Sequence, residues 1–226
     1  MSPKPQDELE DLLAEQVAYY RAQAAEYDVN SPLPYDHASR AALSAALDAF
    51  QPRGEVLELA CGTGRWTAEL ARHASKLTAV DAAPEMLTLA SARVRGKRIR
   101  FIEADIFDWR PEERYDAVFF SAWLSHVPPQ RFDRFWALVD SCLTHSGRVF
   151  LIDELPAVAA QEQSVPDALA PMVERPLSSG AVGRVVKVFR EPSDLHDRLA
   201  ELGWEVELHT VGWRFFYAAG ARAHAA

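Results

Sequence analysis

The first pattern in this 226-residue chain is a run of apolar residues at helical spacing. Apolar positions three and four residues apart predict an amphipathic helix over 7–27. A second helix is predicted where Leu43, Leu47 and Phe50 fall on one face, and Gly54 ends it. The chain therefore opens with two helices before any strand.

Short continuous apolar runs follow, and runs of this length are typical of strands buried on both faces of a parallel sheet. They predict strands over 56–60, 77–81, 99–103, 117–120 and 148–153. Helical patterns over 65–73, from Pro84 and after Pro129 separate most of these strands. This alternation predicts an α/β fold with a mostly parallel sheet.

The C-terminal third is less regular. Residues 155–183 are rich in Pro, Ala, Ser and Gly, and a stretch of this kind is expected to be a functional loop or lid beside the substrate. An alternating strand is predicted over 185–189, and a helix is predicted from Pro192. Two further strands are predicted over 204–208 and 211–218.

The strand at 56–60 ends in a glycine turn, with the sequence Glu58-Leu-Ala-Cys-Gly62-Thr-Gly64. A strand that ends in glycines and continues as a helix is typical of a ligand-binding turn in an α/β sheet. A dinucleotide fingerprint needs a third glycine where this chain has Thr67, and the Gly-Lys-Ser/Thr of a phosphate loop is absent. The carboxylate of Glu58 would repel a pyrophosphate and would suit an ammonium or sulfonium ligand.

This turn resembles the first motif, E/D-x-x-x-G-x-G, of the class I S-adenosylmethionine-dependent methyltransferases. Three further positions match that family at suitable spacing. The resemblance implies that Asp81 binds the ribose hydroxyls and that Asp105 faces the adenine amino group. Residues 115–120 match the family's next signature strand.

The fold implied by the resemblance is a Rossmann-like, doubly wound sheet of seven mostly parallel strands with an antiparallel last strand. An N-terminal helical lid precedes it. The expected cofactor is S-adenosyl-L-methionine, and the expected product is S-adenosyl-L-homocysteine. The residues expected to bind it are Tyr20, Glu58, Ala60, Gly62, Gly64, Asp81, Ala82, Met86, Asp105, Ile106 and Ser121.

His126 is the candidate catalytic residue. It lies in the loop after the strand at 117–120, where the methyl group of the cofactor is expected to project. A hydroxyl acceptor would need a general base such as His126, whereas a neutral amine would need only alignment of its lone pair. The alternative is that His126 packs against the cofactor and takes no part in the chemistry.

The helix at 7–27 has two interpretations. It is either an ordinary packing helix or a lid that closes over the cofactor, with Tyr20 as its inward-facing ring. We divide the chain into a lid at 1–34 and a methyltransferase domain at 35–226. Residues 155–190 of that domain form the insert on the substrate side.

The composition of the chain limits the kinds of partner that are expected. The net charge of -9 disfavours non-specific binding to nucleic acid, and no apolar run approaches the length of a membrane span. Two cysteines without a disulfide pattern fit a cytoplasmic location. Neither paired histidines nor a cysteine cluster indicates a metal site.

The predicted function is methyl transfer from S-adenosylmethionine to an oxygen or nitrogen of a small organic metabolite, by a monomer or homodimer. The alternative is a regulatory or non-methylating protein that keeps the fold and the cofactor. A nicotinamide oxidoreductase is disfavoured by Glu58 and Thr67.

Overall fold

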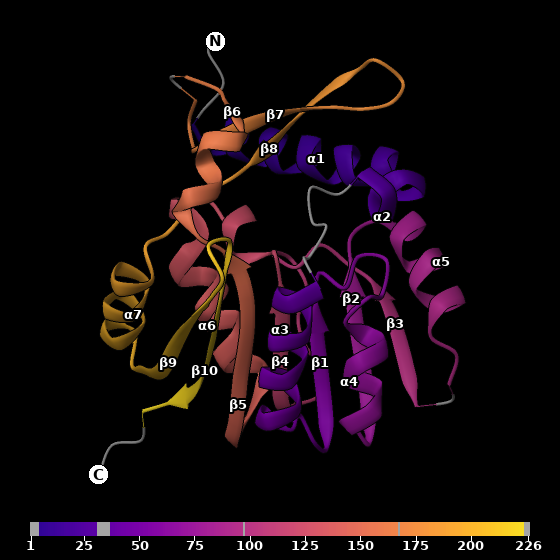
Figure 1. Cartoon of the computed structure of the whole chain (residues 1–226), viewed down its shortest axis with the longest axis vertical. Helices are drawn as coiled ribbons and strands as arrows, with labels where there is room; N and C mark the ends of the chain where they lie inside the picture. The colour runs from indigo at the N-terminus through magenta and orange to yellow at the C-terminus, as the bar shows by residue number, and fades with distance from the viewer. Residues whose placement is uncertain (1–4, 31–36, 97, 167, 224–226) are drawn as a thin grey trace.

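A seven-stranded sheet forms the centre of the molecule (Figure 1). The structure is a computed structural model that describes residues 5–30, 37–96, 98–166 and 168–223. The sheet has the order β3-β2-β1-β4-β5-β10-β9, and β10 runs in the direction opposite to the other six strands. The strands are β1 (Glu55–Leu59), β2 (Lys76–Asp81), β3 (Ile99–Glu103), β4 (Tyr115–Ser121), β5 (Leu143–Glu154), β9 (Trp204–Val211) and β10 (Phe215–Arg222). The predicted fold class is confirmed, including its antiparallel last strand.

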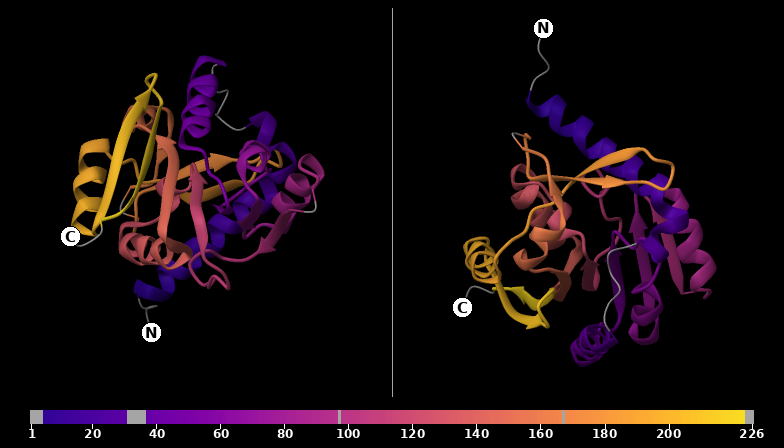
Figure 2. Two further views of the ribbon diagram at one scale, coloured as in Figure 1. Left: turned by 90° about the horizontal axis from the view of Figure 1, so that it is seen from below. Right: turned by 45° about the horizontal axis from the view of Figure 1, so that its top comes forward.

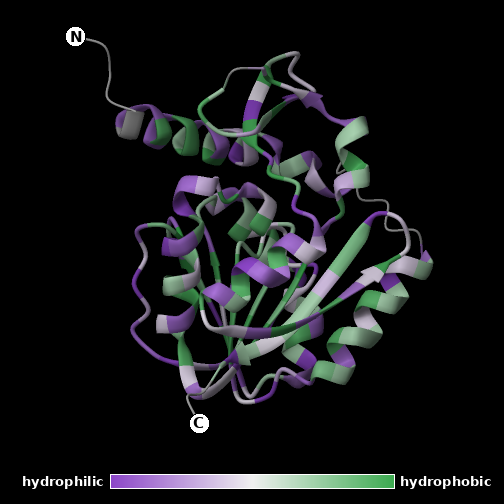
Figure 3. Ribbon diagram, turned by 90° about the vertical axis from the view of Figure 1, so that its left-hand side faces the viewer, coloured by the Kyte–Doolittle hydropathy of each residue, from purple (hydrophilic) through white to green (hydrophobic). Residues whose placement is uncertain are grey.

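Helices cover both faces of this sheet (Figures 1 and 2). The helices on one face are α3 (His37–Phe50), α4 (Thr67–His73) and α5 (Pro84–Arg93). The helices on the other face are α6 (Phe132–Cys142) and α7 (Pro192–Glu201). The central strands between them are largely hydrophobic, as Figure 3 shows, because both of their faces are buried. Within the described ranges, no helix has the length and apolar character that crossing a membrane requires.

A second layer, which we call the roof, lies across the carboxyl ends of the parallel strands (Figures 1 and 2). It combines an N-terminal helical segment with a three-stranded antiparallel sheet from the second half of the chain. Its helical part is α1 (Pro5–Gln23), η1 (Ala24–Glu26) and α2 (Tyr27–Asn30). Its strands are β6 (Gln163–Ser164), β7 (Met172–Pro176) and β8 (Val182–Val186), preceded by the 3-10 helix η4 (Pro156–Gln161).

The roof corrects two sequence predictions. The stretch 155–183 was expected to be irregular, but much of it forms η4, β6 and β7. The strand expected over 185–189 ends at Val186 as β8. These strands are short and pair with one another rather than with the large sheet, so the apolar pattern of each is weak. The predicted boundary of the lid at residue 34 lies outside the described residues.

Helix α1 and the small sheet pack closely. Tyr19 of α1 is buried against Val173 and Val185, which lie on neighbouring strands of the roof. Gly183 of β8 is what permits this approach, because a Cβ atom at that position would lie 2.2 Å from Cδ2 of Tyr19. The two halves of the roof therefore form one packed unit.

We predict that Gly183→Ala loosens α1 from β8 and costs about 1–3 kcal/mol, since the added methyl group overlaps the Tyr19 ring near its root. Limited proteolysis should detect faster cleavage within α1, and thermal unfolding should detect the lost stability. Gly96→Ala is the matched control, because its added Cβ meets only ordinary contacts with Ile99 at 3.8 Å or more. Equal proteolysis of the two variants would contradict this account of the roof.

Candidate functional site

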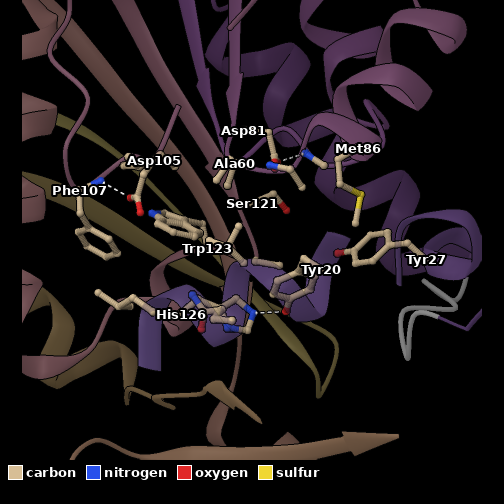
Figure 4. A pocket seen from close by; sticks show the side chains of 18 residues that line it. Tyr20, Tyr27, Ala60, Asp81, Met86, Asp105, Phe107, Ser121, Trp123 and His126 are labelled. Atoms are coloured by element: carbon tan, nitrogen blue, oxygen red, sulfur yellow. Dashed lines mark hydrogen bonds between the residues drawn. The ribbon is translucent and has the colours of Figure 1, made fainter. Parts of the chain in front are cut away.

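A cavity that opens to solvent lies between the roof and the carboxyl ends of the parallel strands, with about 740 Å³ of empty space when its mouth is included (Figure 4). Such an edge is where ligands bind in open α/β sheets. Its lining comes from α1, α2, α5 and the segments that follow β1, β2, β3 and β4. The lining residues are Leu13, Gln16, Val17, Tyr20, Tyr27, Ala60, Gly62, Asp81, Ala82, Ala83, Met86, Asp105, Ile106, Phe107, Ser121, Ala122, Trp123 and His126.

The residues selected from the sequence gather at this cavity. All of them line it except Glu58 and Gly64. Glu58 lines a smaller adjoining hollow, which shares Tyr27, Ala60 and Gly62 with the main cavity. The predicted inward direction of Tyr20 is what the structure has (Figure 4).

The two glycines of the turn have different structural roles. Gly62 has a φ of +53°, and a Cβ atom there would meet nothing within 4 Å. Gly64 has a φ of +79°, and a Cβ atom there would lie 2.9 Å from the Cα atom of Ala90 in α5. Gly62 thus leaves room beside the cavity, whereas Gly64 allows α5 to pack against the turn.

Asp81 fixes the geometry of this end of the sheet. One carboxylate oxygen accepts the backbone N–H of Gly62 at 2.8 Å, and the other accepts the N–H of Ala83 at 2.9 Å. Burial raises the pKa of Asp81, and these two N–H groups offset part of that rise. The carboxylate therefore joins the glycine turn after β1 to the start of α5, and it borders the cavity (Figure 4).

Asp105 lies on the cavity wall after β3. Its carboxylate accepts the backbone N–H of Phe107 at 2.8 Å, so it closes its own turn. Desolvation raises the pKa of this carboxyl, although the residue remains exposed. This bond is the turn-capping role that the sequence left open beside an adenine contact, and it leaves the second carboxylate oxygen available to the cavity.

Glu58 is a deeply buried acid beside the cavity, with 2% of its surface exposed. Burial raises its pKa to about 8, even though the Thr67 hydroxyl donates to it at 2.6 Å. The negative charge of Asp81 acts in the same direction as burial. A carboxyl group in this state ionises readily only when a cation approaches.

Two alanines beside the cavity have a left-handed backbone. Ala60 follows β1 with a φ of +53°, and Ala122 follows β4 with a φ of +52°. Residues other than glycine rarely adopt this conformation, which costs about 1–3 kcal/mol. Backbone strain of this kind often occurs where a ligand is held, and Ala60 and Ala122 both line this cavity, whereas a third such residue, Gln51 with a φ of +52°, lies at the end of α3 away from it.

His126 lies at the roof side of the cavity and is 4% exposed. Its Nδ1 atom is 2.6 Å from the carbonyl oxygen of Val186, so Nδ1 carries the proton and donates it. Its Nε2 atom then accepts from the Tyr20 hydroxyl at 2.9 Å (Figure 4). The N–H of Val186 donates to Gln16 Oε1 at 3.0 Å, and this bond closes a ring that joins α1, β8 and the loop after β4.

The loop that carries His126 is held from two further sides. The half-buried Arg190 donates from its guanidinium to the carbonyl oxygens of Leu124 and Val127, at 2.7 and 2.8 Å. Asp153 at the end of β5 accepts the N–H of Ser125 at 2.9 Å. Burial lowers the pKa of His126 well below its usual value, and the charges of nearby Lys187 and Arg175 act in the same direction. His126 is therefore neutral at physiological pH.

Buried cations lie next to this imidazole. Arg175 of β7 approaches the Tyr20 hydroxyl to 3.4 Å and pairs with Glu162. Lys187 donates to the Ser125 hydroxyl at 2.9 Å and to Glu154 at 2.8 Å. Although burial opposes its ionisation, Lys187 and a second partner, Arg214, hold the pKa of Glu154 below its usual value.

Asp28 of α2 ties the roof to the glycine turn. It accepts the hydroxyl of Thr63 at 2.7 Å and the Nε–H of Arg65 at 2.9 Å, and it pairs with Arg93. These charged hydrogen bonds lower the pKa of Asp28 against the opposing effect of burial. Among the described residues, no group of three or more His, Cys, Asp and Glu side chains is placed to hold a metal ion.

Sequence reasoning missed several of these residues. Arg175 lies in the stretch 155–183, for which the sequence predicts only a loop or lid beside the substrate, and Lys187 falls inside the strand predicted over 185–189. Gln16 and Asp28 gave no signal, since a polar residue on an amphipathic helix is usually solvated. The cations near the histidine could be found from the sequence only if the pairing of β7 with β8 were already known.

Comparison with known proteins agrees with this geometry. The family described as "Methyltransferase domain" matches residues 56–147, which contain the glycine turn, both aspartates and His126. The chain is 40% identical in sequence to DhpI in its solved complex with SAM and HEP. The two structures match over 93% of this chain and 97% of that chain, with a TM-score of 0.83. The DhpI–SAH complex is 38% identical, covers 94% and 97% of the two chains, and has a TM-score of 0.81.

Curated relatives match over a shorter segment. A trans-aconitate 2-methyltransferase of Escherichia coli O7:K1 is 36% identical over 92 residues, which is 40% of this chain and 35% of the relative. The enzyme of the same name from Escherichia coli O1:K1 is 39% identical over 75 residues, or 32% and 29%. The chain thus matches about a third of the length of these relatives.

The likeness to DhpI extends over nearly the whole of both chains, and the strand order, the glycine turn and the cavity agree with it. The chain belongs to the class I S-adenosylmethionine-dependent methyltransferases.

Proposed function

We propose that this chain transfers the methyl group of S-adenosylmethionine to an oxygen of a small organic acid. S-Adenosylmethionine supplies an electrophilic methyl group on a sulfonium, which becomes a neutral thioether when the C–S electron pair stays on sulfur. The acceptor's oxygen lone pair forms the new O–CH₃ bond. The observation that carries the proposal is the pair of buried cations, Arg175 and Lys187, beside a neutral histidine.

The cavity fits the donor. Asp81 is the proposed ribose ligand, Asp105 the adenine ligand, and Met86 and Ile106 the apolar contacts of the base. Glu58 lies in the adjoining hollow, where a buried acid would gain its charge by meeting the ammonium group of the methionine part. The open space at Gly62 lets the ligand lie against the main chain between these groups.

The state of His126 favours an acid over a hydroxyl acceptor. Both of its nitrogens already have partners, and its lowered pKa makes it a weak base. A phenol or alcohol must lose a proton as it attacks, so it would need a better base. A carboxylate arrives without that proton and needs only to be positioned.

The charges around the site also favour an acidic acceptor. Behind the cavity lining at the His126 end lie four buried or half-buried cations, Arg175, Lys187, Arg190 and Arg214, together with three carboxylates, Asp153, Glu154 and Glu162. One positive charge remains in excess, which would attract an anion and repel a protonated amine. The name of the Escherichia coli relatives, trans-aconitate 2-methyltransferase, also refers to an organic acid.

The acceptor class is tested with labelled S-adenosylmethionine and a panel of carboxylic acids, phenols and amines. We expect methyl uptake by at least one carboxylic acid. We also expect His126→Gln to keep its rate within about tenfold, because a carboxylate brings no proton to remove. Uptake by phenols or amines alone, or a loss of about 10²–10⁴-fold in His126→Gln, would instead favour general base catalysis by His126.

The ribose assignment is tested with Asp81→Asn. This change removes the charge while keeping the size of the side chain, so it should raise the dissociation constant of S-adenosylhomocysteine by about 10- to 100-fold. Isothermal calorimetry measures this directly. Asp108→Asn is the control, since Asp108 is an exposed acid near the same cavity. An unchanged affinity in Asp81→Asn would remove Asp81 from the proposed ribose site.

Glu58 predicts a pH dependence of stability without any ligand. Unfolded glutamate titrates at about pH 4.3. In the folded protein Glu58 titrates at about 8, so the folded state holds the extra proton between these values. Its contribution to stability is full below the lower value and is lost as the pH rises through the upper one, with a total of a few kcal/mol.

Thermal unfolding at pH 5.5 and pH 9 checks this sign. Wild type should lose more stability over this range than Glu58→Gln, whose amide does not titrate. Glu8→Gln on the exposed side of α1 should behave as wild type does. Parallel curves for wild type and Glu58→Gln would show that Glu58 is ionised throughout.

A further inference from the structure

The ion pair of Arg175 and Glu162 is built into the small sheet of the roof. Gln163 of β6 lies opposite Glu174 of β7, so the next position places Glu162 opposite Arg175. The Nε atom of Arg175 lies 3.3 Å from Oε2 of Glu162, and Nη2 of Arg175 donates to Oε1. Only 15% and 10% of these two side chains are exposed. Opposite charges that face each other across strands stabilise a sheet modestly, so a structural role is the simplest explanation.

The pair also lies next to the proposed acceptor site, which a purely structural role does not require. Nη1 of Arg175 is 3.4 Å from the Tyr20 hydroxyl, which in turn donates to His126. The pair therefore lies directly behind the two side chains at the end of the cavity where the acceptor is proposed to bind. The charge of Glu162 reaches this point, because it contributes to raising the pKa of both Tyr19 and Tyr20 after burial has raised them.

Glu162 also differs from Glu154 in the number of cations that it binds. Glu154 holds two cations, Lys187 and Arg214, and so leaves one positive charge over. Glu162 holds Arg175 alone and cancels it. Removal of the negative charge at Glu162 would thus raise the excess around the acceptor from one to two.

We infer that Glu162 is a specificity-determining residue, which limits the acceptor to a single negative charge by cancelling the charge of Arg175. This inference rests on the proposed function, since it assumes an acidic acceptor at this end of the cavity. An acceptor with a second carboxylate would place that group near Glu162 in poorly hydrated surroundings, where like charges repel strongly.

The variant Glu162→Gln tests the inference, because glutamine keeps the size of the side chain and a carbonyl acceptor for Arg175. The probes are the best monocarboxylate of the acceptor panel and its analogue with a second carboxylate at the far end. We expect the ratio of kcat/KM for the dicarboxylate to that for the monocarboxylate to rise about tenfold or more. Glu162→Asp keeps the charge and should keep the wild-type ratio.

The matched control is Glu15→Gln, which removes the exposed partner of Arg184 between α1 and the same small sheet. Its ratio should equal that of wild type. Calorimetry with both acids and the S-adenosylhomocysteine complex of each variant gives the same comparison without turnover, and thermal unfolding reports whether Glu162→Gln remains folded.

The outcomes are distinct. Wild type that methylates and binds no acid overturns the proposed function, and this inference fails with it. Methylation of acids with a ratio that is unchanged in Glu162→Gln, or with an equal change for both acids, overturns the inference alone and leaves Glu162 as a structural partner of Arg175. A shift in Glu162→Asp as large as that in Glu162→Gln would assign the effect to packing rather than to charge.

Discussion

One imidazole joins the three parts of the molecule that surround the cavity. His126 belongs to the loop after β4, accepts from Tyr20 of α1 and donates to Val186 of β8. Because Nδ1 must carry the proton for the bond to a carbonyl, the tautomer of the ring is fixed by the backbone of the roof. The positions of α1, β8 and the loop are therefore set together, and the neutral state of His126 is a consequence of this arrangement.

The opposite wall of the cavity depends on carboxylates rather than on a histidine. Asp81 accepts two backbone N–H groups, from Gly62 and Ala83, and so fixes the ends of neighbouring strands without using a side-chain partner. Strain at Ala60 and Ala122, together with the buried acid Glu58, lies at the same edge. These costs lie beside the cavity, whereas the two faces of the sheet below are packed with apolar side chains.

The large sheet could be predicted from the sequence because its strands are buried on both faces and appear as apolar runs. The same runs contain Glu58, end in Asp81 or lead to Gly62 and Asp105, so the wall that faces the donor could be inferred as well. Parallel strands place their carboxyl ends at one edge, and this geometry brings distant residues together without knowledge of their side-chain contacts.

The roof could not be predicted in the same way. Its strands β6, β7 and β8 are two to five residues long, and their partners are one another and α1. Arg175 meets Glu162 through the register that sets the two residues opposite each other, and Lys187, the residue after β8, is buried beside Glu154. Helical spacing identified Tyr20 as inward-facing, but its contact with His126 is 106 residues away in sequence.

The two walls of the cavity would also bind different reactants. The sheet edge carries the acids that would hold a cationic donor, and the roof carries Tyr20, Arg175 and, just beyond β8, Lys187. A donor and an acceptor of opposite charge would thus be bound by opposite walls, with a neutral imidazole between them. Both reactants would be held in the cavity between these two walls. Water would then be excluded from the cavity as the two reactants are aligned, which is the main requirement of a transfer that creates no new charge.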